Sequence, residues 1–286
     1  MKKFCIITNS DKEAGMKEAE HIRQLLRGFG ADCHILKNEP IGQNGQPRYT
    51  NEKYIPEGTE CAFVLGGDGT MIQAANDLAH LDIPILGVNV GTLGFLTEVE
   101  EEGLADACRR LVADDYSVEK RIMLYGYLEG QEEQYNRHAL NDFVVTKSGI
   151  CRLITLKVYV GDELADEYRA DGIIVCTPTG STGYNLSAGG PVLAPSMASM
   201  SITPICPHSL NNRSLVVSAG DVIRIEIGQS KESQMDEAVL MVDGNHILQM
   251  KTGDSVVIRR SLEDTCLVKL TKTCFFERMR EKLNGK

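Results

Sequence analysis

The sequence has 286 residues, of which 42% are hydrophobic and 24% are charged, a composition typical of a globular protein with one large or two ordinary domains. Its formal net charge of -10 argues against a nucleic-acid partner, because phosphate backbones attract basic surfaces. The nine cysteines form no C-x-x-C pair, which argues against a zinc site or a disulfide-rich secreted scaffold. No apolar run is long enough for a signal peptide or a membrane span, so a cytoplasmic protein with no membrane partner is expected.

The first part of the chain alternates short apolar runs with amphipathic helical patterns. The predicted strands are residues 3–8, 32–36, 60–67 and 83–90. The predicted helices are residues 13–30 and 70–81. This alternation predicts an α/β domain with a parallel sheet over residues 1–118.

The segment 43–58 has few large aliphatic residues and several Gly, Pro and Asn residues. It is typical either of a surface loop that could close over a site or of an ordinary long connection. Both interpretations stay open from the sequence.

Strand-like runs dominate after residue 118. They are separated by Gly-Asp, Asp-Gly and Gly-Gln turns with little helix between them. This pattern predicts a mostly antiparallel, all-β sandwich domain over residues 119–265. Residues 266–286 are predicted to form a tail, with a short helix, that packs back on the N-terminal domain.

The stretch "LGGDGT", residues 65–70, ends a predicted strand and opens a predicted helix. Glycines let backbone N–H groups approach a ligand, and a helix N-terminus favours anions, so a phosphate site is predicted here. Thr70 is expected to cap the helix and Asp68 to stand at the mouth, where an acid could hold a metal ion or accept a proton. A tight turn with a capping acid is the alternative, since the spacing matches neither the Rossmann nor the Walker pattern.

A second glycine-rich corner, "GVNVGTLGFLT" at residues 87–97, ends the next predicted strand. Ligands of parallel α/β sheets bind at the carboxyl ends of the strands. Two neighbouring strands that end in such corners therefore favour the binding-site interpretation of the first one.

The stretch "YRADGIIVCTPTGSTGYNLSAGGP", residues 168–191, runs from a strand into a loop rich in hydroxyls and bare amides. Hydroxyls such as those of Thr179 and Thr182 suit a sugar or a phosphate, and Tyr184 could stack on a base. Arg169 and Asp171 lie two apart and would share one face of an extended strand. A Ser/Thr-rich loop that only caps a helix is the alternative.

Four motifs in this order closely resemble the NAD kinase family. They are "GGDGT", "LND" at residues 140–142, "DGIIVCTPTGSTGYNLSAGGP" and "PICPHSL" at residues 204–210, and together they span nearly the whole chain. "GGDGT" is shared with lipid kinases of the diacylglycerol type and loosely with phosphofructokinases, whereas the long Thr-rich block is specific to NAD kinases.

The resemblance implies an α/β domain of the phosphofructokinase and diacylglycerol kinase type, a β-sandwich domain, and a site in the cleft between them. It implies transfer of the γ-phosphoryl group of ATP, or of polyphosphate in some members, to the adenosine 2′-hydroxyl of NAD, giving NADP. A divalent cation, usually Mg²⁺, is implied with the nucleotide. The histidines show no metal-ligand spacing, so no protein metal cage is expected. A homodimer or homotetramer is implied, in which a neighbouring subunit contributes to the NAD pocket.

Site roles follow from the resemblance residue by residue. Asp68 corresponds to the catalytic acid, proposed as the base on the 2′-hydroxyl, with Gly69 beside it. Asn141 and Asp142 correspond to an Asn-Glu pair that grips the adenosine part, with one methylene less reach at Asp142.

The remaining positions are expected to contact the dinucleotide. Those in the Thr-rich loop are Thr179, Thr182, Gly183, Tyr184, Asn185 and Ser187. Arg169 and Asp171 correspond to a pair whose aspartate reaches the nicotinamide end or a neighbouring subunit. Arg152 corresponds to a further contact position, and Asn245 stands where the family often has Gln.

Two other classes of function stay open from the sequence. A lipid or sphingoid kinase would share the "GGDGT" corner but would be expected to associate with membranes. A nucleotide sensor without catalysis would bind NAD and form no product, although it would have no need of Asp68.

Overall fold

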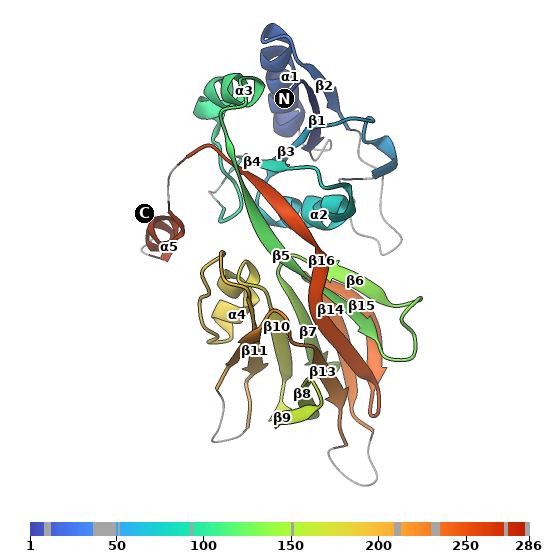
Figure 1. The fold of residues 1–286 in the computed structure, drawn as a ribbon. Helices are drawn as coiled ribbons and strands as arrows, with labels where there is room; N and C mark the ends of the chain where they lie inside the picture. Colours follow the sequence, from blue (N-terminus) through green and yellow to red (C-terminus); the bar gives the residue numbers. More distant parts are fainter. Residues whose placement is uncertain are drawn as a thin grey trace. The chain divides into compact units, whose positions relative to one another are not determined.

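The computed structural model describes residues 1–8, 13–36, 50, 52–91, 94–149, 152–208, 213–229, 235–271 and 274–283. The chain forms two compact units, which we call the first unit (Met1–Arg121 with Glu263–Lys286) and the second unit (Ile122–Leu262). Two strands, β5 (Ser117–Leu128) and β16 (Ser255–Lys269), belong in part to each unit (Figure 1). Half of the loop predicted at residues 43–58, namely residues 43–49 and 51, lies outside the described residues, and Glu52–Tyr54 of the described half forms a 3-10 turn.

The first unit is built on a parallel sheet, as predicted. Its strands follow the order β2-β1-β3-β4, and the end of β16 runs parallel to β4. Gly66 at the end of β3 is in register with Asn89 at the end of β4, so both glycine-rich corners leave the sheet at one edge. The elements are β1 (Lys3–Thr8), α1 (Glu13–Gly28), β2 (Asp32–Ile35), β3 (Cys61–Gly66), α2 (Asp68–Leu78), β4 (Ile85–Asn89), α3 (Leu104–Val112) and α5 (Phe275–Leu283), with 3-10 turns at Glu52–Tyr54, Ala79–Leu81 and Glu101–Gly103.

Helices cover both faces of this sheet (Figure 1). On one face, Phe63 and Leu65 of β3 pack in a single apolar cluster with Ile22 of α1 and Leu111 of α3. On the other face α2 approaches closely at Gly87, where a Cβ would lie 2.9 Å from the Met71 Sδ. Strands buried on both faces explain why β1, β3 and β4 are nearly continuous apolar runs.

The second unit is antiparallel, which confirms the predicted all-β domain, and its strands belong to a six-stranded sheet and to the ten-stranded sheet that also contains the strands of the first unit. One has the order β12-β11-β10-β7-β14-β15, and in the other β16 pairs with β13, β13 with β8 and β8 with β9, while β5 pairs with β16 and β6. The elements are β6 (Asn136–Ala139), β7 (Asp142–Lys147), β8 (Ile154–Val160), β9 (Glu163–Ala170), β10 (Gly172–Cys176), α4 (Tyr184–Ser187), β11 (Ser199–Ile205), β12 (Leu215–Ser218), β13 (Ile223–Ile227), β14 (Glu237–Val242) and β15 (Asn245–Lys251), with a 3-10 turn at Gly180–Thr182.

Apolar side chains from both sheets form the core of the second unit. Phe143 and Val175 come from one sheet, and Leu156, Ile225 and Ile258 come from the other. The opposite face of the six-stranded sheet carries a smaller cluster, of Val144, Ile174, Cys176 and Ile205, against which Ala188 and Met241 pack. No helix of the described residues is long and apolar enough to cross a bilayer.

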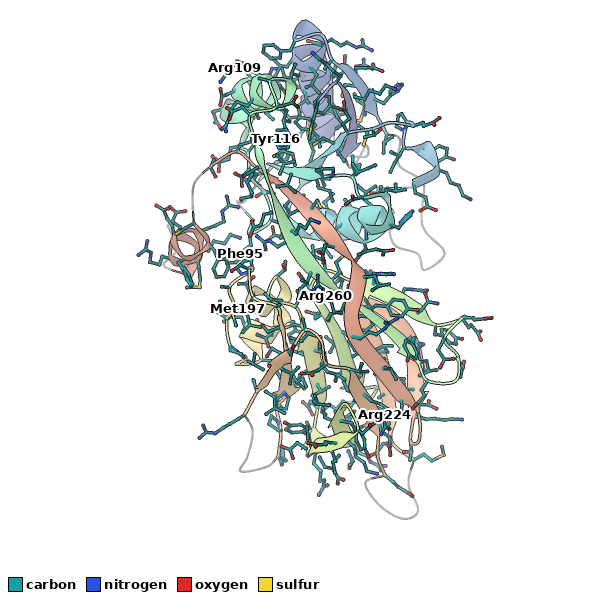
Figure 2. The ribbon with its side chains drawn as sticks, in the orientation of Figure 1. Phe95, Arg109, Tyr116, Met197, Arg224 and Arg260 are labelled. Carbon is teal, nitrogen blue, oxygen red and sulfur yellow. The ribbon has the colours of Figure 1, made fainter. Side chains whose placement is uncertain are left out.

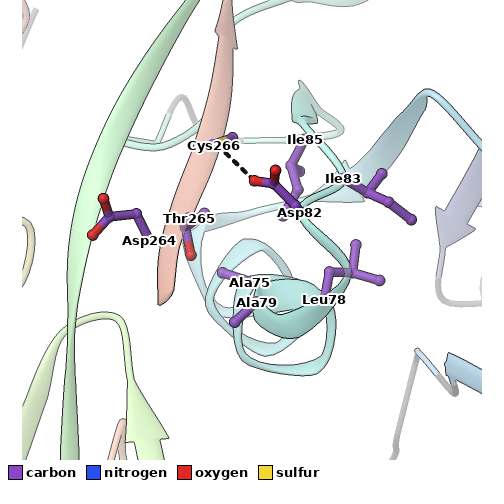
Figure 3. A pocket seen from close by; sticks show the side chains of 9 residues that line it. All are labelled: Ala75, Leu78, Ala79, Asp82, Ile83, Ile85, Asp264, Thr265 and Cys266. Carbon is purple, nitrogen blue, oxygen red and sulfur yellow. Dashed lines mark hydrogen bonds between the residues drawn. The ribbon is translucent and has the colours of Figure 1, made fainter. Parts of the chain in front are cut away.

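A narrow pocket lies beside α2 in the first unit (Figure 3). Its wall is mostly aliphatic, and the Cys266 Sγ lies 3.8 Å from the Asp82 Oδ1 at one side. The pocket is too tight to admit a water molecule, so it offers no room for a ligand.

Candidate active site

The first glycine-rich corner joins β3 to α2. A Cβ at Gly66 would lie 2.8 Å from the Thr70 Cβ, so this close turn requires glycine. The expectation that Thr70 caps the helix is wrong. Helix α2 begins at Asp68 with Gly67 as its N-cap, and no side chain caps it, because Thr70 already lies inside the first turn, packed against Gly66.

The Asp68 carboxylate is held by the second glycine-rich corner. It accepts hydrogen bonds from the backbone N–H groups of Phe95 (2.9 Å) and Leu96 (3.0 Å). Gly94 makes room for it, since a Cβ there would lie 2.7 Å from the Asp68 Cγ. The two corners predicted from sequence are thus joined through one acid, and Gly69 lies exposed beside it.

In the second unit, the Leu140–Asp142 corner is organised by Asp243. The Asp243 carboxylate accepts three successive backbone N–H groups, from Leu140 (2.8 Å), Asn141 (2.8 Å) and Asp142 (2.9 Å). Asp243 itself has a φ of 48°, in the left-handed region that few residues other than glycine adopt. Three bonds to one carboxylate at a strained position indicate that this corner is rigidly held.

Asp142 is buried beside that carboxylate and is only 5% exposed. Burial, and then the like charge of Asp243, raise the pKa of Asp142 to about 7. Near neutral pH the Asp142 side chain can therefore donate a hydrogen bond as well as accept one.

The Asp142→Asn variant is expected to gain stability relative to the wild type as pH rises. The folded pKa of this carboxyl is raised above its unfolded pKa. Its ionisation therefore begins to destabilise the fold as pH rises past the unfolded pKa, and the destabilisation is complete above the folded pKa. The stability difference should therefore grow from about pH 4 and level off above about pH 7, reaching on the order of 4 kcal/mol, since the shift is about three pKa units at about 1.4 kcal/mol each. Urea unfolding at pH 4.5, 6 and 8.5 measures it, with the exposed Asp162→Asn as the control. A difference that does not change with pH would contradict this assignment.

The Thr-rich loop packs on the same corner. Thr177 donates its hydroxyl to the Leu140 carbonyl (2.6 Å) and its N–H to the Asn141 carbonyl (2.9 Å). A Cβ at Gly180 would lie 2.6 Å from the Asn141 carbonyl carbon, so only glycine fits this approach of two backbones. The local sequence thus positions the loop against Asn141.

Several loop side chains are engaged within the loop. The fully buried Asn185 donates to the carbonyls of Ser181 (3.1 Å) and Pro191 (2.9 Å) and accepts from the Thr203 hydroxyl (2.7 Å). Thr182 donates its hydroxyl to the Thr179 carbonyl (3.2 Å). Thr179 is itself buried, whereas Gly183, Tyr184 and Ser187 are exposed. The exposed groups are the ones that can meet a ligand without rearrangement.

A cavity of about 220 Å³ opens where the corner, the loop and a hairpin turn meet. Its lining residues are Asn141, Asp142, Val144, Tyr184, Met241, Asp243 and Gly244. Apolar walls with a few convergent polar groups are typical of small-molecule sites. Three predicted residues, Asn141, Asp142 and Tyr184, are therefore brought together, and the exposed Asn245 follows Gly244 at the start of β15.

The other predicted residues of the second unit are not among those that line this cavity. The sequence pattern suggested that Asp171 shares a strand with Arg169, but it does not. It occupies the corner where the chain leaves β9 in one sheet and enters β10 in the other, and there it forms an ion pair with Lys147. Arg169 and Arg152 are exposed.

Two groups of residues that hold the site were not predicted from the sequence. In the sequence, Asp243 and Gly244 form an Asp-Gly pair that indicates only a turn. The contact of Asp243 with residues 140–142 depends on the pairing of β14 with β7, which no local pattern indicates. The second corner was predicted, yet the roles of Gly94, Phe95 and Leu96 depend on a contact that only the fold creates.

The chain matches two family models and many curated proteins. Residues 5–116 match the ATP-NAD kinase N-terminal domain and residues 140–270 match the ATP-NAD kinase C-terminal domain. The NAD kinase of Lachnoclostridium phytofermentans is 43% identical over 289 residues, covering 100% of both chains. The NAD kinase of Lachnospira eligens is 40% identical over 293 residues, covering 99% of this chain and 100% of the relative.

Two solved structures share the fold. Yeast NADH kinase complexed with NADH aligns with a TM-score of 0.82 at 23% identity, covering 100% of this chain and 88% of the other. An NAD kinase from Archaeoglobus fulgidus in complex with ATP aligns with a TM-score of 0.76 at 22% identity, covering 99% of each. Both family models and the full-length relatives agree with the motifs in the sequence, and the chain belongs to the NAD kinase family.

Proposed function

We propose that Asp68 orients the adenosine 2′-hydroxyl of NAD for attack on the γ-phosphorus of ATP. Within the NAD kinase family the chain is a phosphotransferase with an alcohol group as acceptor. In this step the bond from the 2′-oxygen to phosphorus forms, the bond to the β-phosphate oxygen breaks, and the hydroxyl proton passes to Asp68 or to water. A carboxylate is a weak base at neutral pH, so orientation is its main contribution.

The observation that carries this proposal is the fixed carboxylate of Asp68. It stands on the first turn of α2, beside a bare glycine corner, and two backbone N–H groups hold its direction. A helix N-terminus with glycines favours phosphate groups, so the γ-phosphate of ATP would lie next to the acid. Phosphoryl transfer needs alignment more than covalent help, and a rigid acid supplies alignment.

The cavity of the second unit is proposed to hold the adenosine part of NAD. Asn141 and Asp142 would hydrogen-bond adenosine, and Asp142 can do so as donor or acceptor because its pKa is near 7. Tyr184 is 46% exposed at the cavity wall, where its ring could stack on a base. Asn245 would contact the same part of the ligand from the hairpin turn.

The remaining assignments rest on the family resemblance. Thr179, Thr182, Gly183, Asn185 and Ser187 would line the path of the dinucleotide. The side chains of Asn185 and Thr182 hydrogen-bond within the loop, so they would act by maintaining its conformation. Arg169 and Asp171, with Arg152 as a further contact, would meet the nicotinamide end, within one chain or across a homodimer or homotetramer.

Mg²⁺ is proposed to accompany ATP. Among the described residues, no group of three or more His, Cys, Asp and Glu side chains could hold a metal ion. The Asp68 carboxylate offers hard oxygen donors that suit Mg²⁺, and phosphate oxygens and water would complete the coordination. When bound, the cation neutralises charge on the transferred phosphoryl group.

We further propose a cytoplasmic location. The eight cysteines of the described chain are free thiols, six of them buried, as expected in a reducing compartment. Burial raises the pKa of the Cys5 and Cys33 thiols to about 12, which keeps them protonated and unreactive.

The purified protein is expected to form NADP from NAD, ATP and Mg²⁺. Polyphosphate in a parallel reaction tests the donor, and a sphingoid base or diacylglycerol in place of NAD tests the lipid kinase alternative. NAD binding without product from either donor would support the sensor alternative and overturn this proposal.

A further inference from the structure

The C-terminal helix α5 contacts the loop that holds Asp68. The Arg278 Nη1 donates to the carbonyl oxygens of Thr97 (2.5 Å) and Phe95 (3.3 Å). The Lys282 Nζ lies 4.6 Å from the centroid of the Phe95 ring. Figure 2 labels Phe95 next to this helix. All these residues belong to the first unit.

One peptide group lies between Arg278 and Asp68. Its carbonyl oxygen belongs to Phe95 and accepts from Arg278, while its N–H belongs to Leu96 and donates to Asp68. A cation at the carbonyl end polarises a peptide group and strengthens its N–H as a donor. The guanidinium thus both fixes the plane of this peptide and increases its hold on the carboxylate.

Buried ion pairs fix Arg278 and the end of this loop. The Arg278 side chain is 12% exposed, and its Nη2 lies 3.5 Å from the Glu98 Oε2. Glu98 also pairs with Lys269 and accepts the N–H groups of Leu270 (3.0 Å) and Thr271 (2.8 Å). A charged side chain with several partners in a nearly dry site has little freedom to move.

We propose that Arg278 is a positioning residue for phosphoryl transfer, acting on Asp68 through the peptide group between Phe95 and Leu96. The inference rests on the role of Asp68 under the proposed function. Under this proposal the C-terminal helix contributes to the active site through the position of Asp68.

The test is a double-mutant cycle with Arg278→Gln and Asp68→Asn in the full-length protein. In the wild-type background, Arg278→Gln is expected to lower kcat about tenfold with both KM values within twofold. In the Asp68→Asn background the same change should lower the residual kcat less than twofold, because the carboxylate it positions is gone. An enzymatic NADP cycling assay gives the sensitivity that the residual rate requires.

Two further variants separate positioning from general stability. Arg278→Lys keeps the charge and can keep one carbonyl contact, so its kcat should lie between those of wild type and Arg278→Gln. Arg280→Gln, on the exposed face of the same helix, should leave kcat unchanged.

The outcomes distinguish the two proposals. If Arg278→Gln lowers kcat by the same factor in both backgrounds, or leaves kcat unchanged in the wild-type background, the positioning role of Arg278 is overturned. The proposed role of Asp68 is unaffected by either result. Full turnover of Asp68→Asn alone overturns the proposed function itself.

Discussion

The Asp68→Asn variant is expected to lose a factor of roughly 10³ in kcat, the range for a group that orients or deprotonates a nucleophile. Asparagine matches the shape of aspartate but offers one acceptor oxygen where Phe95 and Leu96 both donate N–H groups. Its amide nitrogen would face one of these donors, so the side chain would lose both its charge and its fixed direction. Initial rates of NADP formation at saturating NAD and ATP measure the loss.

NAD binding separates a chemical role of Asp68 from a binding role. Isothermal titration calorimetry should give the same dissociation constant for NAD within about threefold, since the proposed adenosine contacts lie in the second unit. Asp106→Asn is a matched control, because Asp106 is exposed on α3 of the same unit and pairs only with Arg109 in the described structure. Full turnover of Asp68→Asn with normal NAD binding would falsify the role of the acid.

The Gly94→Ala variant is expected to lower kcat by about 10²-fold, the low end of the range for loss of a positioned acid–base group, with little effect on stability. The added methyl would lie 2.7 Å from the Asp68 Cγ, and a flexible side chain yields more easily than backbone. The carboxylate would therefore rotate away from the N–H groups of Phe95 and Leu96. The fold would survive while the acid lost its position.

Kinetics and unfolding together test this prediction. Thermal unfolding should shift by only a few degrees, and kcat should fall without a matching rise in the KM for ATP. Gly28→Ala is the control, because a Cβ at Gly28 meets no atom within 4 Å. A wild-type kcat in Gly94→Ala would mean that the observed direction of Asp68 is irrelevant to catalysis.

The order and type of most elements could be predicted from the sequence. The apolar runs that became β3 and β4 are bounded by glycine and proline, and the spacing of Met71, Ala74, Ala75 and Leu78 is helical, so local patterns were sufficient. The start of α2 was placed two residues too late, because Thr70 offers a better capping side chain than Gly67 does. Packing of Thr70 against Gly66 decided the boundary instead.

Candidate residues were predicted better than their contacts. Asn141, Asp142 and Tyr184 do line one cavity, as their motifs suggested. Arg169 and Asp171 do not lie on one strand as predicted, because the chain changes sheets between β9 and β10, and residue spacing does not reveal such a change.

The sequence by itself determined the family, the α/β and β architecture, and the two glycine-rich corners, because backbone freedom and hydroxyl content are local properties of a few residues. The tertiary structure alone decided which groups hold the site. Asp68 is separated by 27 residues from Phe95, Asp243 by 101 from Asp142, and Arg278 by 183 from Phe95. Such contacts form only when distant segments are packed together, and their strength depends on burial and hydrogen-bond direction, which no local pattern encodes.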